Sequence, residues 1–399
     1  MMEFKNNIFL NKINTINIYK NFNLPLYIYN YKKIILNFFF IKKLKFFCFF
    51  SIKSNDNIFL LKLINKIFFK FDIVSIGELK KIILISKKKP FIVFSGSGKS
   101  ISEILISLNL NIFSINIESI QEIFKIFYLI KKYKKNINIM IRINPNINAK
   151  THKKITTGTK KNKFGINLFN LKNLLCLNSI LNIKIIGYDF HIGSQITKIS
   201  PLKKMFKLIS NLYLNNNYKY KYLDIGGGIG VNYYFNKKII NFSKYYNEIK
   251  KLIKKYRIKS KIIIELGRYV FCNVCIILSK VNYIKYNKKI FFCILNLGMN
   301  DILRPSLYNS FHKIESFNKG KNTSFFFGPI CESSDKFLSK KIKIKNNCLI
   351  FFYSTGSYCK TMSNNYNSKN KIFEIIVYKN KLKIIFKLES FKQLIKNYV

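Results

Sequence analysis

Short runs of apolar and β-branched residues alternate with longer stretches rich in lysine, leucine and isoleucine over the first two thirds of the chain. Runs of this kind are typical of strands, and the longer stretches have the length of helices. The eight strand-like runs are residues 46–52, 72–76, 91–95, 112–117, 137–143, 183–190, 222–225 and 261–265. Regular alternation of strand and helix predicts parallel strands joined by crossover helices, and eight units predict an α/β fold of the (β/α)8 TIM-barrel type.

Polar residues and glycines follow or close these runs. They are Lys53, Gly77, Glu78, Gly96, Glu118, Asn144, His191, Gly226, Gly227, Gly228 and Glu265. The carboxyl ends of barrel strands all open at one mouth, where active sites of this fold lie. The pattern therefore predicts an active site built from these strand ends.

The rhythm changes after about residue 270, where strand-like runs at 290–297, 347–353, 372–378 and 381–388 have shorter connections. Only Lys379 and Asn380 separate the last two runs, which predicts a hairpin. We expect a barrel over residues 24–270 and a second, mainly antiparallel β domain over 271–399. Residues 1–23 are expected to join the second domain.

The net charge is +54, because 71 lysines and arginines oppose only 17 acidic residues. Such a charge suggests a nucleic-acid-binding protein. However, only four of the basic residues are arginine, the side chain that makes forked contacts with phosphates and bases. The lysines are spread along the whole chain, together with an excess of Asn, Ile, Phe and Tyr, residue types that A+T-rich codons supply. We interpret the charge as compositional bias and expect no nucleic-acid partner.

The eight cysteines form no regular framework. Cys272 and Cys275 make one CxxC pair, but no second pair stands at zinc spacing and the chain has only three histidines, so no metal site is expected. Buried thiols fit a reducing cytoplasm. No signal peptide is evident, and apolar runs such as residues 34–41 are too short to cross a bilayer. A cytoplasmic protein without a membrane segment is expected.

Two glycine-rich segments resemble phosphate-binding motifs. Gly96-Ser-Gly-Lys-Ser100 lacks the first glycine of a P-loop, since Val93 stands at that position, and a P-loop is not expected. The segment 226–230 is GGGIG and differs from GxGxxG, since Val231 holds the last position. Its glycines fit an anion site made of backbone N–H groups, or simply a tight turn, and the local sequence leaves both open.

Eleven segments follow one another in a fixed order: residues 51–55, 75–79, 92–99, 116–119, 142–166, 187–196, 223–233, 265–268, 297–308, 328–335 and 356–368. Together they resemble the bacterial diaminopimelate decarboxylases, members of the barrel-plus-β-domain pyridoxal-phosphate decarboxylases. The resemblance begins at Leu24-Pro-Leu-Tyr27 and covers nearly the whole chain. It implies a pyridoxal-phosphate enzyme that converts meso-diaminopimelate to L-lysine and CO₂, the last step of lysine biosynthesis.

The resemblance also assigns roles around the cofactor. Lys53 resembles the lysine that bonds to the cofactor aldehyde, and composition alone could not distinguish it among 67 lysines. Glu265 resembles the carboxylate that pairs with the pyridine nitrogen, His191 the imidazole that stacks on the ring, and Cys331 the proton donor. The residues implied around the phosphate are Ser194, Gly226, Gly227, Gly228, Gly267, Arg268 and Tyr358. Without the motifs, His191 and Cys331 would be ordinary core residues, and Glu265 an ordinary strand-end carboxylate.

A second set of residues resembles the family's substrate site. Arg268, Arg304 and Tyr308 stand at the positions that bind the carboxylate of the non-reacting end, Glu332 at the position that binds its ammonium, and Tyr358 at a position that contacts substrate and phosphate. Arginine suits a carboxylate because of its two-pronged donor geometry. The resemblance further implies a homodimer in which the partner subunit supplies Cys331 and Glu332.

Two departures from the family pattern stand next to these residues. Leu266 replaces a proline after Glu265, which predicts a looser turn. Cys359 replaces a glycine after Tyr358, which predicts strain if that position needs a positive φ.

Two alternatives remain open at this stage. One is a decarboxylase of ornithine or arginine, and the other is a basic nucleic-acid-binding protein without catalysis. Arg257 has no role in any of these interpretations.

Overall fold

The computed structural model describes residues 18–149, 152, 155–159, 162–171, 173–174, 183–215, 220–235, 239–287, 290–317, 322–379 and 381–398. The chain divides into two compact units. The barrel unit comprises residues 38–231 and 239–269, and the β unit comprises residues 1–37, 232–238 and 270–399. Each unit has its own sheet.

Eight parallel strands of the barrel unit close on themselves. They run in the order β5-β4-β3-β2-β10-β9-β8-β6, and the parallel pairing of β5 with β6 completes the circuit. Their bounds are β2 Phe47–Ser51, β3 Lys70–Ile73, β4 Phe91–Phe94, β5 Ser114–Ile117, β6 Ile139–Asn144, β8 Ile185–Asp189, β9 Tyr222–Asp224 and β10 Lys261–Leu266. The predicted (β/α)8 barrel is confirmed, and each strand overlaps one of the eight apolar runs. The two-residue strand β7 (Ile166–Asn167), which pairs with β6 outside the circuit, was not predicted.

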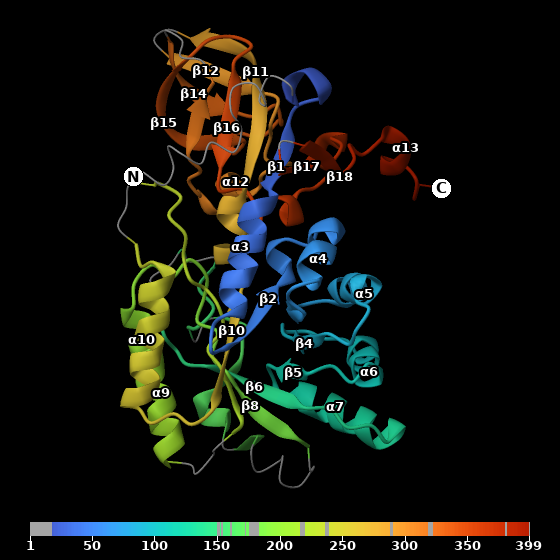
Figure 1. Cartoon of the computed structure of the whole chain (residues 1–399), viewed down its shortest axis with the longest axis vertical. Coiled ribbons are helices and arrows are strands. Elements are labelled where there is room, and N and C mark those ends of the chain that lie inside the picture. Colours follow the sequence, from blue (N-terminus) through green and yellow to red (C-terminus); the bar gives the residue numbers. More distant parts are fainter. Residues whose placement is uncertain are drawn as a thin grey trace. The chain divides into compact units, whose positions relative to one another are not determined.

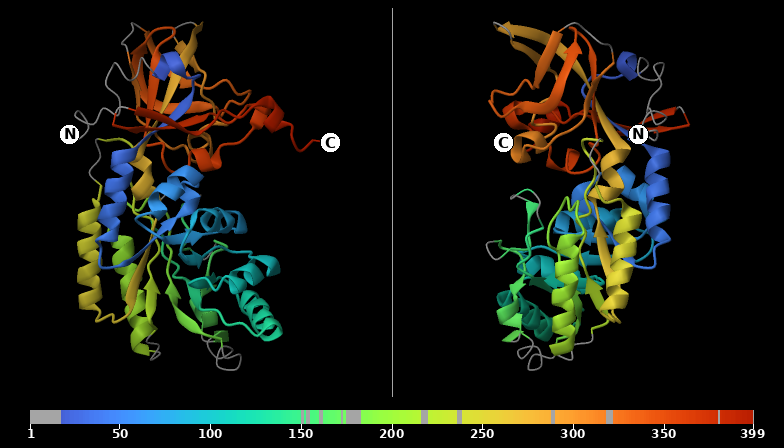
Figure 2. Two further views of the ribbon diagram at one scale, coloured as in Figure 1. Left: turned by 45° about the vertical axis from the view of Figure 1, so that its right-hand side comes forward. Right: turned by 90° about the vertical axis from the view of Figure 1, so that its left-hand side faces the viewer.

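Helices lie around the outside of these strands (Figures 1 and 2). Their bounds are α3 Tyr31–Lys42, α4 Ile58–Asn65, α5 Ile76–Ile85, α6 Ile101–Asn109, α7 Ile120–Tyr133, α9 Ser200–Asn215 and α10 Phe242–Lys255. Serine caps explain where three of them begin. Ser75, Ser100 and Ser119 each accept the backbone N–H of a glutamate three residues later. These caps fix where the helices that follow strands β3, β4 and β5 begin.

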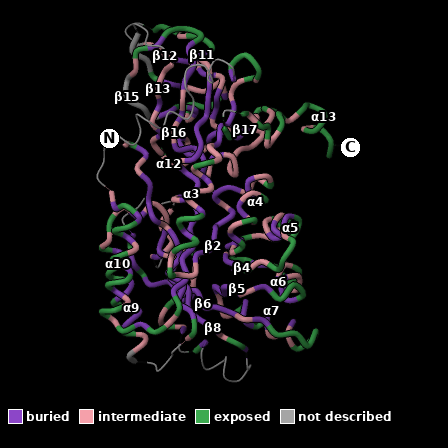
Figure 3. The backbone as a smooth tube through the Cα atoms, in the orientation of Figure 1, coloured by how far each residue is buried: buried purple, intermediate pink, exposed green. Residues whose placement is uncertain are grey.

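The barrel interior is apolar towards one end of the strands. Phe49, Val93, Met140, Ile186 and Ile263 form a buried cluster together with Tyr222. Residues nearer the carboxyl ends of the strands are polar and also buried, and the strands are drawn almost entirely as buried tube in Figure 3. A packed apolar layer at one end and polar side chains at the other direct any chemistry to the carboxyl-end mouth.

The β unit contains a mixed sheet in the order β15-β14-β12-β11-β1-β17-β18, and β16 pairs with both β11 and β13. Its strands are β1 Leu26–Asn30, β11 Cys275–Asn287, β12 Ile290–Leu295, β13 Ile314–Ser316, β14 Asn322–Phe327, β15 Lys336–Ile344, β16 Leu349–Tyr353, β17 Phe373–Tyr378 and β18 Lys381–Phe386. The pairs β1–β17 and β12–β14 are parallel and the others antiparallel. The predicted hairpin is present as β17–β18. Three short helices follow β10, β12 and β18: α11 (Arg268–Phe271), α12 (Arg304–Tyr308) and α13 (Phe391–Leu394).

The expected limits of the barrel differ from this division at its start and at one internal segment. Residues 26–30 were expected in the barrel, but β1 is a central strand of the β unit, hydrogen-bonded to β11 on one side and β17 on the other. Residues 232–238 also belong to the β unit, although the chain on both sides of them lies in the barrel unit. Sequence patterns identify strands but do not say which partner a strand pairs with, and the boundary depends on that pairing.

Lys99, the lysine of the P-loop-like segment, is buried and fully bonded. Its Nζ donates to the carbonyl oxygens of Gly96 (2.6 Å) and Asn116 (2.7 Å) and to Glu122 Oε1 (2.7 Å). An ammonium has three donors, and here all three have acceptors. Lys99 therefore joins β4 to β5 and α7, and it has no donor left for a phosphate.

No helix among the described residues is both long enough and apolar enough to span a bilayer.

Candidate active site

Four neighbouring strands place most of the predicted cofactor residues together. In the order β2-β10-β9-β8, the strands are followed or closed by Lys53, by Glu265 with Gly267 and Arg268, by Gly226–Gly228, and by His191 with Ser194. Adjacent strands lie about 4.8 Å apart, so β2 and β9 are separated by roughly 10 Å. The lysine and the glycine turn therefore lie on one side of the same mouth.

Lys53 stands in the 3₁₀ turn Ile52–Ser54, directly after β2. Its Nζ lies 3.2 Å from Asp72 Oδ2 on β3, and a third of its side chain is exposed while Asp72 is fully buried. Ser51 Oγ donates to the same carboxylate oxygen at 2.7 Å. Burial raises the pKa of Asp72, and repulsion from Glu265 adds to this, while Lys53 and Ser51 oppose both. Lys53 is thus held at the mouth with its amine reachable.

Glu265 is a buried carboxylate that keeps its charge. Burial pushes its pKa upward, but the contact with His191 and the charges of Lys53 and Arg142 outweigh burial and hold the pKa at about 2. His191 Nδ1 lies 3.4 Å from Glu265 Oε2, and Ser95 Oγ donates to Oε1 at 3.3 Å. Burial lowers the pKa of His191. A buried carboxylate that is ionised at neutral pH suits a partner that carries a positive ring nitrogen.

The glycine turn after β9 needs glycine for its own packing. Gly226 and Gly228 have φ values of 64° and 88°, which disfavour other residues. A Cβ on Gly227 would collide with the carbonyl oxygen of Glu265, and one on Gly228 with that of Gly193. The backbone N–H of Gly226 donates to Asp224 Oδ1 at 2.7 Å, and that of Gly227 faces His191 Nδ1 at 3.4 Å. The glycines therefore form a tight turn, one of the two interpretations that the local sequence left open. A role of their backbone N–H groups in binding phosphate stays a prediction.

Arg268 and Ser194 are joined by two hydrogen bonds. Arg268 Nε and Nη2 donate to Ser194 Oγ at 3.2 and 3.0 Å. Arg268 is the first residue of α11 and is buried at the end of β10. Gly267, just before it, packs against Ser54 and Ser51 closely enough that a Cβ would crowd both side chains. Leu266 is buried and pairs with Phe50 as the last residue of β10, so the strand continues in register where the family has proline.

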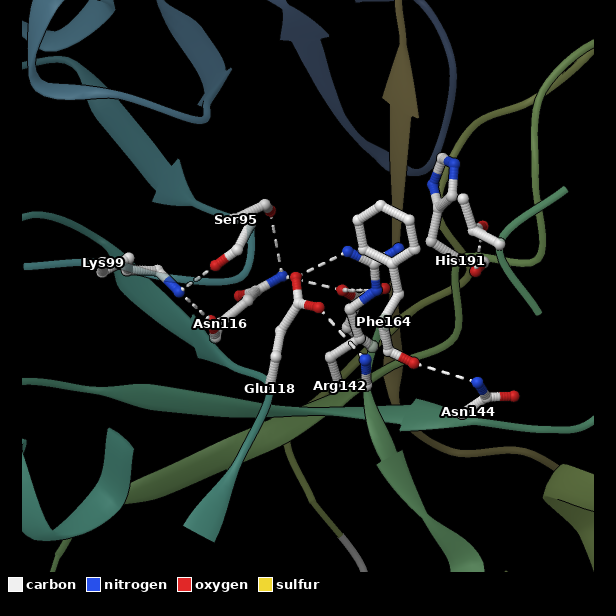
Figure 4. Close-up of polar contacts among 12 residues, drawn as sticks. Ser95, Lys99, Asn116, Glu118, Arg142, Asn144, Phe164 and His191 are labelled. Atoms are coloured by element: carbon white, nitrogen blue, oxygen red, sulfur yellow. Dashed lines mark hydrogen bonds and ion pairs between the residues drawn. The ribbon is translucent and has the colours of Figure 1, made fainter. Parts of the chain in front are cut away.

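A buried network around Arg142 was not predicted. Arg142 on β6 donates to Glu118 Oε1 at 2.7 Å, and its Nε lies 3.8 Å from Asp189 Oδ2 (Figure 4). Asn116 Nδ2 bridges Asp189 Oδ2 and Ser95 Oγ, which continues the network to Glu265. Each of these residues stands at the carboxyl end of a predicted strand. Their position at strand ends was the signal in the sequence that could have identified these residues. The contacts that join them across different strands cannot be read from the sequence.

Asp189 behaves differently from Glu265 within this network. Burial, followed by repulsion from Glu265 and Glu118, raises its pKa to about 8 against the pull of Arg142. Burial likewise raises the pKa of Asp224 well above its usual range. Within one buried network, Glu265 therefore stays ionised while Asp189 is protonated near neutral pH.

In the β unit, Arg304 begins α12 and is buried, and Tyr308 ends the same helix. Cys331 and Glu332 lie in an exposed loop between β14 and β15, where Tyr366 Oη donates to Glu332 Oε1 at 2.7 Å. Tyr358 has a φ of 57°, whereas Cys359 has a φ of −104°. Backbone strain at Cys359 is not expected, because its φ is negative; the neighbouring residue with a positive φ is Tyr358.

The comparisons with known proteins agree with this geometry. Residues 36–272 match the family model of the pyridoxal-dependent decarboxylases, pyridoxal binding domain. Diaminopimelate decarboxylases of Neisseria meningitidis serogroup A and Haemophilus influenzae are 34% and 36% identical, over 87% and 86% of this chain and 87% and 85% of their own length. The chain belongs to the diaminopimelate decarboxylase family. The predicted cofactor, pyridoxal phosphate, and the predicted enzyme class, a carboxy-lyase, are confirmed with it.

A solved structure supports the same membership. The crystal structure of diaminopimelate decarboxylase from Helicobacter pylori complexed with L-lysine has a TM-score of 0.88 and 32% identity, and the match covers 96% of this chain and 98% of that one. Lysine decarboxylase from Selenomonas ruminantium, at 20% identity and a TM-score of 0.82, shares the fold.

The raised pKa of Asp189 predicts a pH-dependent stability. An unfolded aspartate has a pKa of about 4, so between pH 4 and 8 the folded chain binds roughly one proton more than the unfolded chain at this residue. The stabilisation is complete below pH 4 and is lost as the pH rises through about 8. Asp189→Asn should reduce the fall in unfolding free energy between pH 6 and 8 by up to about 1.4 kcal/mol per pH unit. Urea denaturation at several pH values measures this, and identical slopes for both proteins would contradict it.

Proposed function

We propose that this protein removes CO₂ from meso-diaminopimelate to give L-lysine, the last step of lysine biosynthesis, with pyridoxal phosphate as cofactor. The observation that carries the proposal is the set of groups after β2, β10, β9 and β8: a reachable amine, an ionised buried carboxylate, an imidazole and a tight glycine turn. Relatives named diaminopimelate decarboxylase support the substrate, and the lysine bound in the Helicobacter pylori enzyme supports the product.

These groups fit the chemical functions of the cofactor one by one. Lys53 offers a primary amine for the aldehyde, and Glu265 offers a negative charge for the ring nitrogen. His191 is suited to lie against the ring face. For the phosphate, the barrel unit offers the backbone of Gly226, Gly227, Gly228 and Gly267 and the side chains of Ser194 and Arg268, and the resemblance to the family adds Tyr358. When bound, pyridoxal phosphate takes up the electron pair left behind as CO₂ departs.

The chain's own residues control charge and protons around that step. With a pKa of about 2, Glu265 stays ionised and stabilises a proton on a ring nitrogen next to it. Asp189, protonated near neutral pH, adds no competing charge. Cys331 is an exposed thiol, suited to return a proton to the carbon that has lost CO₂.

The non-reacting end of the substrate carries one carboxylate and one ammonium. Arg268, Arg304 and Tyr308 supply donors for the carboxylate, Tyr358 adds a hydroxyl, and Glu332 supplies an acceptor for the ammonium. Ornithine and arginine lack the second carboxylate, so the two buried arginines favour diaminopimelate over both.

We also propose a homodimer with shared active sites. Cys331 and Glu332 are exposed on the β unit of the single chain. Residues that complete the active site of a partner subunit would be exposed in this way when one subunit is viewed alone. A cytoplasmic location stays a prediction, consistent with free rather than disulfide-bonded described cysteines.

An activity assay tests the substrate. The purified protein, supplied with pyridoxal phosphate, should release CO₂ from meso-diaminopimelate with a kcat/KM at least roughly 100-fold above that for ornithine or arginine, since a buried arginine left without its carboxylate costs that much. Equal turnover of ornithine would overturn the substrate. No turnover of any amino acid, with steep salt-dependent binding to DNA, would favour the non-catalytic alternative.

Chemical labelling tests Lys53 without any assay of activity. Borohydride reduction of the loaded protein followed by peptide mapping should place the pyridoxyl group on Lys53. Lys99 is the internal control, because its amine is buried and fully bonded. A label on any other lysine would refute the assignment.

Mixed dimers test the shared site. Lys53→Ala and Cys331→Ala should each be nearly inactive alone. If Cys331 acts in the partner's site, mixing equal amounts should restore roughly a quarter of the wild-type activity, because half of the random dimers are mixed and each of these has one intact site. Recovery that never exceeds the sum of the separate variants would show that each chain uses its own cysteine.

A further inference from the structure

The β unit holds a buried contact between Arg304 and His312 that no part of the proposed mechanism uses. Arg304 Nη1 lies 2.7 Å from His312 Nε2, and both residues are at most 5% exposed. His312 Nδ1 lies 3.0 Å from the carbonyl oxygen of Tyr353. His312 follows α12 in the chain, four residues after Tyr308, and is one of only three histidines.

These two contacts determine the protonation of the imidazole. A guanidinium has only N–H donors, so His312 Nε2 must accept and carry no proton. A carbonyl oxygen only accepts, so Nδ1 must carry the proton and donate. His312 is therefore neutral and held as one tautomer.

The rest of the Arg304 guanidinium is oriented but not neutralised. Its Cζ lies 4.5 Å from the centre of the Tyr233 ring, and that ring packs edge-on against His312 with 5.2 Å between centroids. Arg304 Nε is buried and has no hydrogen-bond acceptor, and no carboxylate forms an ion pair with Arg304 within the described part of the chain. A buried guanidinium without a counter-ion and with an unused donor indicates a site for an anion.

We propose that His312 is a positioning residue for recognition of the substrate's second carboxylate. By accepting one N–H from Arg304, it fixes the plane of the guanidinium above Tyr233 and leaves Nε and the remaining donors for the carboxylate that is not removed. Because neutral His312 carries no negative charge, it does not neutralise the Arg304 guanidinium. A glutamate at position 312 would pair with Arg304 and block binding of the anion. The inference rests on the proposed function and adds a specificity role to it.

Kinetics of two variants test the role. His312→Phe removes the acceptor and should raise KM for meso-diaminopimelate roughly 10- to 100-fold, the usual cost of losing a hydrogen bond to a charged group, with kcat changed far less. His312→Gln offers an amide oxygen to Arg304 and should recover most of the loss. His152→Phe is the matched control, because the His152 side chain is exposed and far along the chain from α12, and it should leave KM unchanged.

A pair of inhibitors separates positioning from general damage. L-lysine keeps the carboxylate that Arg304 is proposed to bind, and pentane-1,5-diamine lacks it. In His312→Phe, inhibition by L-lysine should weaken by the same factor as KM, and inhibition by the diamine should stay the same. Equal weakening of both inhibitors, or no change in KM, would overturn the proposal.

The tautomer can be measured on the unmodified holoenzyme, and a variant is needed only to assign the signal. ¹⁵N shifts of labelled histidine should show one ring of the three protonated at Nδ1 and bare at Nε2 across the neutral range, and this signal should be missing in His312→Gln. A cationic or Nε2-protonated His312 would refute the inference. Absence of diaminopimelate turnover by the wild-type protein would instead refute the proposed function and leave the tautomer result standing.

Discussion

The charge on Glu265 is the constraint on which the barrel's chemistry depends. Several carboxyl groups are buried at the same mouth, and burial alone would protonate all of them. Only Glu265 combines contact with an imidazole and proximity to both Lys53 and Arg142, so it alone is pulled to a low pKa. The closed pairing of β5 with β6 is what brings β6, with Arg142, round to face β10. An open sheet of the same strands would not gather these groups.

The apolar runs were sufficient to predict the barrel because its strands are buried on both faces. Such strands read as continuous hydrophobic segments, and each was located to within a few residues. The unpredicted elements are those whose placement depends on distant partners. β1 lies inside the residue range expected for the barrel but pairs with β11 and β17, and β7 is too short to produce a pattern.

The candidate site divides along a similar line. Lys53 could be selected among so many lysines only by resemblance to the family, since no local property distinguishes it. Asp72, Asp189, Arg142 and His312 could have been suspected from their position near strand ends or after α12, yet the partners described above lie between 8 and 73 residues away along the chain. Protonation states such as the tautomer of His312 follow from paired distances and have no counterpart in a sequence.

The few arginines have a consequence for other chains of this composition. Arg142, Arg268 and Arg304 are all buried in defined geometry, while Arg257 alone is exposed. Where a point charge on a flexible stem suffices, lysine has taken almost every position. Where a planar cation with several donors must hold two groups at once, arginine remains. In other chains of this composition, a buried arginine is therefore the first position to test for binding of a planar anionic group.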